Sequence, residues 1–161
     1  MPTTLTHTDA EFPKSWKKTA DAYSEDHLID AYLRGVKDGR SKYEKILMAQ
    51  LHNNLNVVGQ ATEALINETL KLEIPFAEIH LSADNIDSFT ILGVVDEKDF
   101  VTDEFRSVFT IARSIKNENE KNEIYLIFTF VPYSPKLNQS CIVSDGYAWK
   151  YAKIPRTPES R

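Results

Sequence analysis

One segment constrains the fold more than any other: residues 123–133, EIYLIFTFVPY, form the strongest β-forming run in the chain. Successive side chains of a strand point to opposite faces, and here both faces are largely apolar. One face carries Ile124, Leu126, Phe128 and Phe130, and the other carries Tyr125, Ile127, Thr129 and Val131. A strand with two apolar faces is typically covered on both sides, so we predict that 123–131 is a central strand that Pro132 ends.

Helical periodicity dominates the part of the chain that precedes this strand. Apolar residues recur at helical spacing over about 25–37 and again over about 42–72, and the residues just before Pro75 end the second run. An Asp38-Gly39 turn signal separates the two runs. We therefore expect two helices, and one long kinked helix is the alternative interpretation.

After Pro75 the apolar pattern alternates, as it does in a strand. Residues 77–83 predict a half-exposed strand, and 88–95 predicts a second strand that is apolar on both faces. A helix that opens near Thr102 then leads to 123–131. If 88–95 and 123–131 are parallel, this connection should be a right-handed crossover.

A β-hairpin is expected near the end of the chain. Asp145-Gly146 is a strong two-residue turn signal, and it lies between the short runs 141–143 and 147–151. The predicted order is helix, helix, strand, strand, helix, strand, strand, strand. This order indicates an α+β fold in which two N-terminal helices pack on a small mixed or antiparallel sheet with one crossover helix.

A length of 161 residues fits a single domain with a core of its own. We place this α+β domain at 24–151, with a helical part at 24–72 and a sheet part at 75–151. Residues 1–23 show no clear period and predict a flexible N-terminal arm, and 152–161 predict a C-terminal tail.

Charge and cysteine content narrow the classes of protein. A net charge of −5 and a pI near 5.4 speak against broad binding to nucleic acid or anionic membranes, which favour a basic surface. The single cysteine, Cys141, cannot form an internal disulfide, and its neighbours Ile142 and Val143 predict a small buried apolar residue. No run approaches the roughly 20 apolar residues of a membrane span, and the N-terminus lacks the apolar core of a signal peptide. We expect a soluble, cytoplasmic protein.

Acidic residues lie at the ends of the predicted strands. Asp84 and Asp87 fall in the turn before 88–95, and Asp96 directly follows that strand. Carboxylates at strand ends can hold Mg²⁺ for phosphoryl or nucleotidyl transfer, because a hard cation prefers oxygen ligands. In a plain antiparallel hairpin, however, the two groups lie at opposite ends of the sheet. Solvated turn residues are therefore the leading interpretation, with no metal or cofactor, and a metal-dependent transferase or an inactive relative is the alternative.

His80 shares a strand face with Glu78 and Ser82, which is a set of side chains that nucleophilic catalysis could use. Residues at i and i+2 on a strand lie about 7 Å apart, which is beyond hydrogen-bond reach unless the side chains lean together. The sequence therefore predicts a polar strand face rather than a catalytic group.

Two features bear on nucleic-acid binding. Phe128-Thr129-Phe130 invites comparison with the aromatic strands that stack RNA bases, but Ile and Leu stand where the RNA-recognition motif carries Gly and Lys or Arg. These aromatics are interpreted as core. A basic stripe on the helices predicts a solvated face, with an acidic partner or a nucleic acid as the weaker alternatives. This stripe consists of Arg34, Lys37, Arg40, Lys42 and Lys45.

The second helix carries an apolar arc of roughly 200°, wide enough to need two packing partners. The sheet can be one of them, and the other is either the helix at 25–37 or the same helix of a second copy. Leu51, Val58 and Leu65 recur at intervals of seven, as a helix–helix seam requires. Asn54 projects into the same arc, where pairing with its own copy across a two-fold axis would satisfy its amide. The sequence thus predicts a homodimer, and the leading hypothesis is a non-enzymatic interaction or assembly protein that uses its long helices as the contact surface.

Overall fold

A five-stranded mixed sheet organises the computed structural model, which describes residues 14–18, 25–33 and 40–154. All neighbouring strands are antiparallel except the last pair, which is parallel. In spatial order the strands are β1 (Trp16–Lys18), β5 (Trp149–Tyr151), β2 (Phe76–Ala83), β3 (Ser88–Val95) and β4 (Tyr125–Pro132). This arrangement confirms the α+β class.

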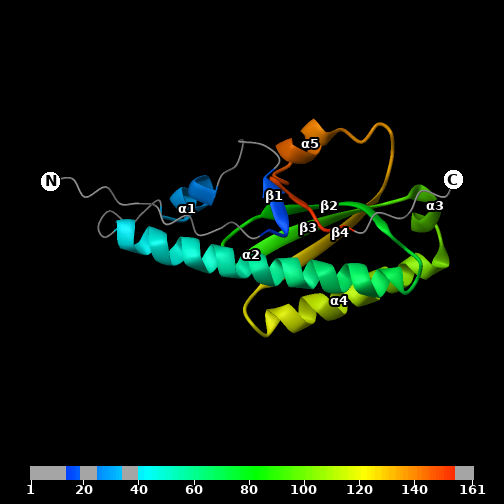
Figure 1. Ribbon diagram of the computed structural model, residues 1–161, viewed down its shortest axis with the longest axis horizontal. Coiled ribbons are helices and arrows are strands. Elements are labelled where there is room, and N and C mark those ends of the chain that lie inside the picture. Colours follow the sequence, from blue (N-terminus) through cyan, green and yellow to red (C-terminus); the bar gives the residue numbers. More distant parts are fainter. Residues whose placement is uncertain (1–13, 19–24, 34–39, 155–161) are drawn as a thin grey trace.

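Helices cover the two faces of the sheet unequally. The two long helices α2 and α4 lie side by side on one face, and the short helix α5 lies on the opposite side (Figure 1). The helices are α1 (Glu25–Leu33), α2 (Arg40–Leu70), α3 (Glu97–Phe100), α4 (Arg106–Glu120) and α5 (Gln139–Ser144), and a 3-10 turn, η1 (Asp103–Phe105), precedes α4. Along the described parts of the chain, no helix combines the length and the apolar character that a membrane crossing requires.

The main core lies between the sheet and the pair α2 and α4. Apolar residues of β2 and β3, such as Ile79, Leu81 and Ile91, pack there against helical residues such as Leu65 and Val108. All of these side chains are fully buried. The apolar faces that the 3.6-residue period gives the helices and the 2-residue period gives the strands pack against each other in this layer.

The strand predicted to be central, β4, is an edge strand. It pairs in parallel with β3, which is the condition on which the sequence predicted a crossover connection, but among the described strands nothing pairs with its other edge. Its helix-facing residues Leu126 and Phe130 are buried, whereas Tyr125 and Ile127 on the other face are 47% and 55% exposed. The prediction of an interior strand is therefore wrong, because β4 has a neighbour on one side only among the described strands, and the prediction that both faces are covered is wrong, because one face is left open.

The predicted C-terminal hairpin is also wrong. Cys141 and its neighbours belong to α5, which begins where the Asn138 side chain accepts a hydrogen bond from the Ser140 N–H at 2.9 Å. Gly146, with a φ of +98°, turns the chain after this helix into β5. Cys141 is exposed rather than buried.

The predicted N-terminal arm contributes to the sheet. Trp16 begins β1, its side chain is buried, and its Nε1–H donates to the carbonyl of Leu55 in α2 at 3.3 Å. At the other end, Ile154 packs against the core although it falls in the predicted tail. The remaining arm and tail residues, 1–13, 19–24 and 155–161, lie outside the described part of the chain.

Candidate functional site

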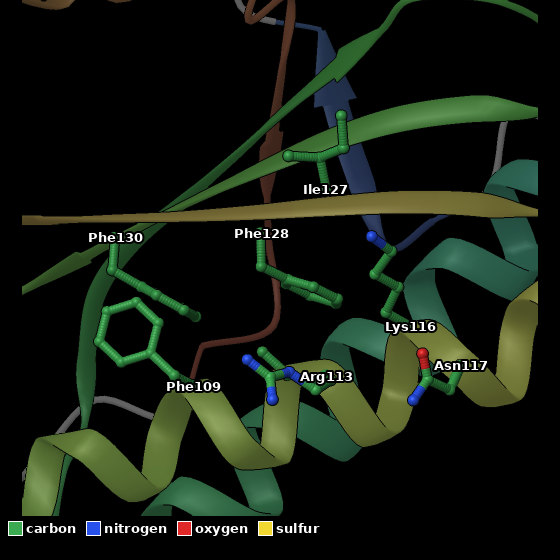
Figure 2. Close-up of a pocket in the computed structure, with 8 residues that line it drawn as sticks. Phe109, Arg113, Lys116, Asn117, Ile127, Phe128 and Phe130 are labelled. Carbon is green, nitrogen blue, oxygen red and sulfur yellow. The ribbon is translucent and has the colours of Figure 1, made fainter.

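A groove of about 410 Å³ runs between the edge strand β4 and the helix α4 (Figure 2). The side chains of Phe128 and Phe130 extend from β4 toward the helix, and Phe109 extends from α4 toward the strand. Arg113 and Lys116 also extend from α4 toward β4. The groove thus combines an aromatic floor with two cationic side chains.

The aromatic floor is held by ring–ring packing. Phe109 meets Phe130 edge to face, with ring centroids 5.4 Å apart, and Phe128 stacks beside Phe130 at 6.5 Å. Phe105, which is buried, contacts both Phe109 and Phe130 from beneath. Phe109 nevertheless remains 51% exposed, so part of its ring is open to a ligand.

The cations of the groove are free to meet an acidic group. Phe109, Arg113 and Lys116 lie at i, i+4 and i+7, which places them on one face of α4. Arg113 makes no ion pair with any described residue. The Nζ of Lys116 lies 3.9 Å from Oε1 of Glu120, and an exposed pair of this kind contributes little. The groove is therefore locally positive in a chain whose net charge is −5.

Among the described residues, no backbone group pairs with the outer edge of β4. The N–H of Tyr125 donates to the carbonyl of Asp87 at 2.9 Å, and that of Tyr133 donates to the carbonyl of Val95 at 2.6 Å. In a parallel ladder, alternate residues direct their N–H and C=O groups to opposite neighbours. The residues whose backbone groups face away from β3 are therefore Leu126, Phe128 and Phe130.

The usual protections of a sheet edge are missing along most of β4. From Tyr125 to Val131 the strand contains no charged residue and no proline, and Pro132 is the first position that cannot donate. The exposed side chains of Tyr125 and Ile127 add apolar surface on the face opposite the groove. An edge of this composition is a template for pairing with another extended segment.

A second polar cluster lies on the other face of the sheet, beneath α5. His80 is 1% exposed, and its Nε2 lies 2.9 Å from Oε2 of Glu78. The Glu78 carboxylate also accepts hydrogen bonds from Gln139 in α5 at 3.0 Å and from Lys150 in β5 at 3.2 Å. The side chains of residues 78 and 80 lean together, which is the condition under which residues at i and i+2 come within hydrogen-bond reach.

The protonation states of this cluster follow from burial and hydrogen bonding. Burial lowers the pKa of His80, and the hydrogen bond and charge of Glu78 offset only part of this effect. Burial opposes ionisation of Glu78, but hydrogen bonds from Gln139, His80 and Lys150 outweigh it and lower the pKa of the carboxyl. A neutral His80 therefore donates from Nε2 to an ionised Glu78. Ser82 donates to Asp84 at 3.5 Å rather than to His80, so the cluster fastens α5 to the sheet instead of activating a nucleophile.

The acids of the transferase alternative are not brought together. Asp84 accepts a hydrogen bond from Thr90 at 2.7 Å, and Asp87 accepts one from Ser88 at 3.1 Å, both at the start of β3. Asp96 lies beyond the opposite end of β3 and caps α3. Within the described ranges, no group of three or more His, Cys, Asp or Glu side chains could hold a metal ion.

The predicted dimer seam lies inside the protein. Leu51, Val58 and Leu65 are fully buried in its own core. Asn54 donates from Nδ2 to the carbonyl of Ile86 at 2.9 Å, so a partner within the chain satisfies its amide. The chain's own core and the carbonyl of Ile86 therefore already occupy the residues that the sequence predicted for a seam with a second copy.

The predicted basic stripe is described only in part. Lys42 and Lys45 are exposed on α2, and Arg40 begins that helix. Arg34 and Lys37 lie outside the described residues. The groove beside α4, by contrast, was not anticipated, although Phe109, Arg113 and Lys116 at helical spacing carried its signal.

Comparison with protein-family models, with curated proteins and with solved structures found no match to this chain.

Proposed function

We propose that this protein is a non-enzymatic interaction protein that binds an extended segment of a partner protein along the free edge of β4. The observation that carries this proposal is the run of outward backbone groups at Leu126, Phe128 and Phe130, which no described residue pairs with, beside an open groove. An extended peptide that adds a strand to a sheet edge gains backbone hydrogen bonds, while pockets beside the edge select its side chains.

From the sequence, the long helices were predicted to form the contact surface. The seam of α2 is occupied by the core, so the proposed surface moves to α4, which forms one wall of the groove. An added strand would lie along β4 with alternate side chains directed toward Phe109 and Arg113. The other side chains would continue the exposed apolar surface of Tyr125 and Ile127.

A pair of substitutions at Phe128 tests the backbone contribution. Phe128→Pro removes an outward N–H and the aromatic ring, whereas Phe128→Leu removes the ring alone. Proline is tolerated at an edge position whose N–H faces away from the sheet, so the β3–β4 ladder should persist in both variants. Peptides selected on the wild-type protein from a random display library serve as the probe.

We expect wild type and Phe128→Leu to bind the selected peptides, and Phe128→Pro to bind them roughly tenfold more weakly. One buried acceptor left without its donor costs about 1–3 kcal/mol. Calorimetric titration measures this difference, and amide exchange shows whether Leu126, Phe128 and Phe130 become protected by the peptide. Equal binding to the two variants, or peptides that leave these three amides unprotected, would refute strand addition.

A further inference from the structure

We infer that the segment bound at this edge is acidic: it places a carboxylate side chain against Arg113 and Lys116 and an apolar side chain, two residues away, against Phe109. This inference rests on the strand-addition function proposed above. It adds the chemistry of the partner, which backbone pairing alone leaves undetermined.

The spacing of the groove matches that of an added strand. α4 runs antiparallel to β4, with Phe109 beside Phe130 at one end and Lys116 toward the Ile127 end (Figure 2). Side chains on one face of a strand repeat about every 7 Å. Phe109 and Arg113 are four residues apart, or about 6 Å along the helix axis. Consecutive groove-facing residues of the peptide therefore meet first the aromatic floor and then the cations.

The cations select the sign of the charge on the peptide. Arg113 has no ion-pair partner among the described residues, and Lys116 is held only loosely by Glu120. A guanidinium can bind a carboxylate through two parallel hydrogen bonds, which gives the contact both strength and direction. A basic segment would meet the same two charges as repulsion, so the groove discriminates between otherwise equal extended peptides.

The same charges argue against a second copy as the occupant. Two β4 edges that pair antiparallel about a two-fold axis near Phe128 place both α4 helices on the same face of the joined sheet. Arg113 and Lys116 of one copy then face Arg113 and Lys116 of the other across the junction. Like charges in such a position oppose association. An acidic partner removes this repulsion and pairs the cations.

Two synthetic peptides provide the probe: an alternating Thr-Val peptide with one central Glu, and the same peptide with Lys in place of Glu. Calorimetry with the full chain measures both. We expect wild type to prefer the Glu peptide by about tenfold, the value of one charge-assisted contact. Arg113→Glu with Lys116→Glu should reverse the preference.

A matched control carries the same change in net charge outside the groove. Arg106 and Lys121 are exposed on the same segment, where they pair with Asp103 and Glu118. The variant Arg106→Glu with Lys121→Glu should keep the preference for the Glu peptide. A control variant that reverses the preference as well would overturn the inference, because the effect would then come from the overall charge.

The remaining outcomes separate this inference from the function on which it rests. Equal binding of the Glu and Lys peptides, together with loss of binding in Phe128→Pro, overturns the acidic partner and leaves strand addition intact. A Glu preference that Phe128→Pro does not weaken overturns both. A mass that rises with protein concentration in wild type, and not in Phe128→Pro, assigns the edge to a second copy and also overturns the inference.

Discussion

At the scale of single residues, His80 is the clearest case of opposed forces. Its ring is buried, and its Nε2 donates to the ionised Glu78 at 2.9 Å. Its Nδ1 is buried and has no hydrogen-bond partner in the described part of the chain. A neutral ring leaves only an unused acceptor at Nδ1, whereas protonation would place an unpaired N–H there. The neutral form is therefore the one that the fold stabilises.

This preference makes the free energy of unfolding depend on pH. Burial lowers the pKa of His80 below its ordinary 6.5, so the unfolded chain binds a proton that the folded chain resists. The contribution of His80 to the free energy of unfolding is fully present above about pH 6.5. It falls as the pH drops below that value, by at most about 1.4 kcal/mol per pH unit. The lowered pKa of Glu78 adds a loss only below its ordinary 4.5. Urea unfolding of wild type and His80→Gln between pH 6.5 and 4.5 measures the effect. If His80→Gln loses stability as steeply as wild type over this range, His80 is not the cause of the loss.

Gly93 marks a second residue where packing leaves no freedom. A Cβ at this position would lie 2.7 Å from Cε1 of Phe76 and 2.9 Å from Cδ1 of Phe130. These two rings stack with centroids 5.9 Å apart. Gly93 is required because the rings approach the backbone of β3 more closely than any side chain permits.

Gly93→Ala should lower the free energy of unfolding by about 1–3 kcal/mol, the usual cost of overpacking a core. Phe76→Leu shortens one of the two obstructing side chains, so the alanine should cost less in that background. A double-mutant cycle in urea gives the coupling. Additive effects would mean that the clash with Phe76 does not set the cost.

At the scale of elements, the sequence predicted which segments are strands better than it predicted what covers them. Two apolar faces described β3 correctly, because Ile91 and Leu92 are both buried. The same pattern in β4 does not describe two covered faces, because Tyr125 and Ile127 remain exposed. Periodicity reports the polarity of a face, and only the three-dimensional arrangement decides whether that face meets another layer or solvent.

Short elements were harder still. Residues 141–143 are β-forming in isolation, yet they belong to α5, where the Asn138 cap and Gly146 define the ends. A run of three residues carries too little periodicity to separate a helix from a strand. The contact between His80 and Glu78 escaped prediction for a related reason, since it depends on side-chain rotamers and on the burial that α5 provides.

The open edge of β4 predicts an alternating pattern of amide exchange. Amides at 127, 129 and 131 face β3 and should exchange slowly with global unfolding. The amides of Leu126, Phe128 and Phe130 face outward and should exchange much faster. Hydrogen exchange followed by NMR on the peptide-free protein resolves the six positions. Uniformly slow exchange would place another segment against this edge.

At the scale of the whole molecule, the wide apolar arc of α2 finds its partners within one chain. From the sequence, the sheet was the expected partner for one side of this arc. For the other side, a second copy of the chain was preferred over the short first helix. The structure supplies α4, which lies beside the C-terminal half of α2, and Trp16, whose indole N–H donates to the carbonyl of Leu55. The crossover helix could not be placed beside α2 from periodicity, because the choice of sheet face is a property of the assembled fold.

This arrangement predicts the effect of shortening a buried side chain of α2. Leu65 is fully buried, so Leu65→Ala should lower the free energy of unfolding by about 2–5 kcal/mol through loss of apolar contact and the cavity left behind. If Leu65 belonged to a dimer seam, the melting temperature would rise with protein concentration, and the substitution would lower the molecular mass. If Leu65 lies in a single-chain core, the melting temperature should not depend on protein concentration, and the substitution should not change the molecular mass. Glu63→Ala, an exposed change on the same helix, serves as the control and should leave stability within about 0.5 kcal/mol of wild type. Thermal melts over a hundredfold range of concentration, with light scattering at each end, decide between the two: a concentration-dependent melt that Leu65→Ala abolishes would return this residue to an interface.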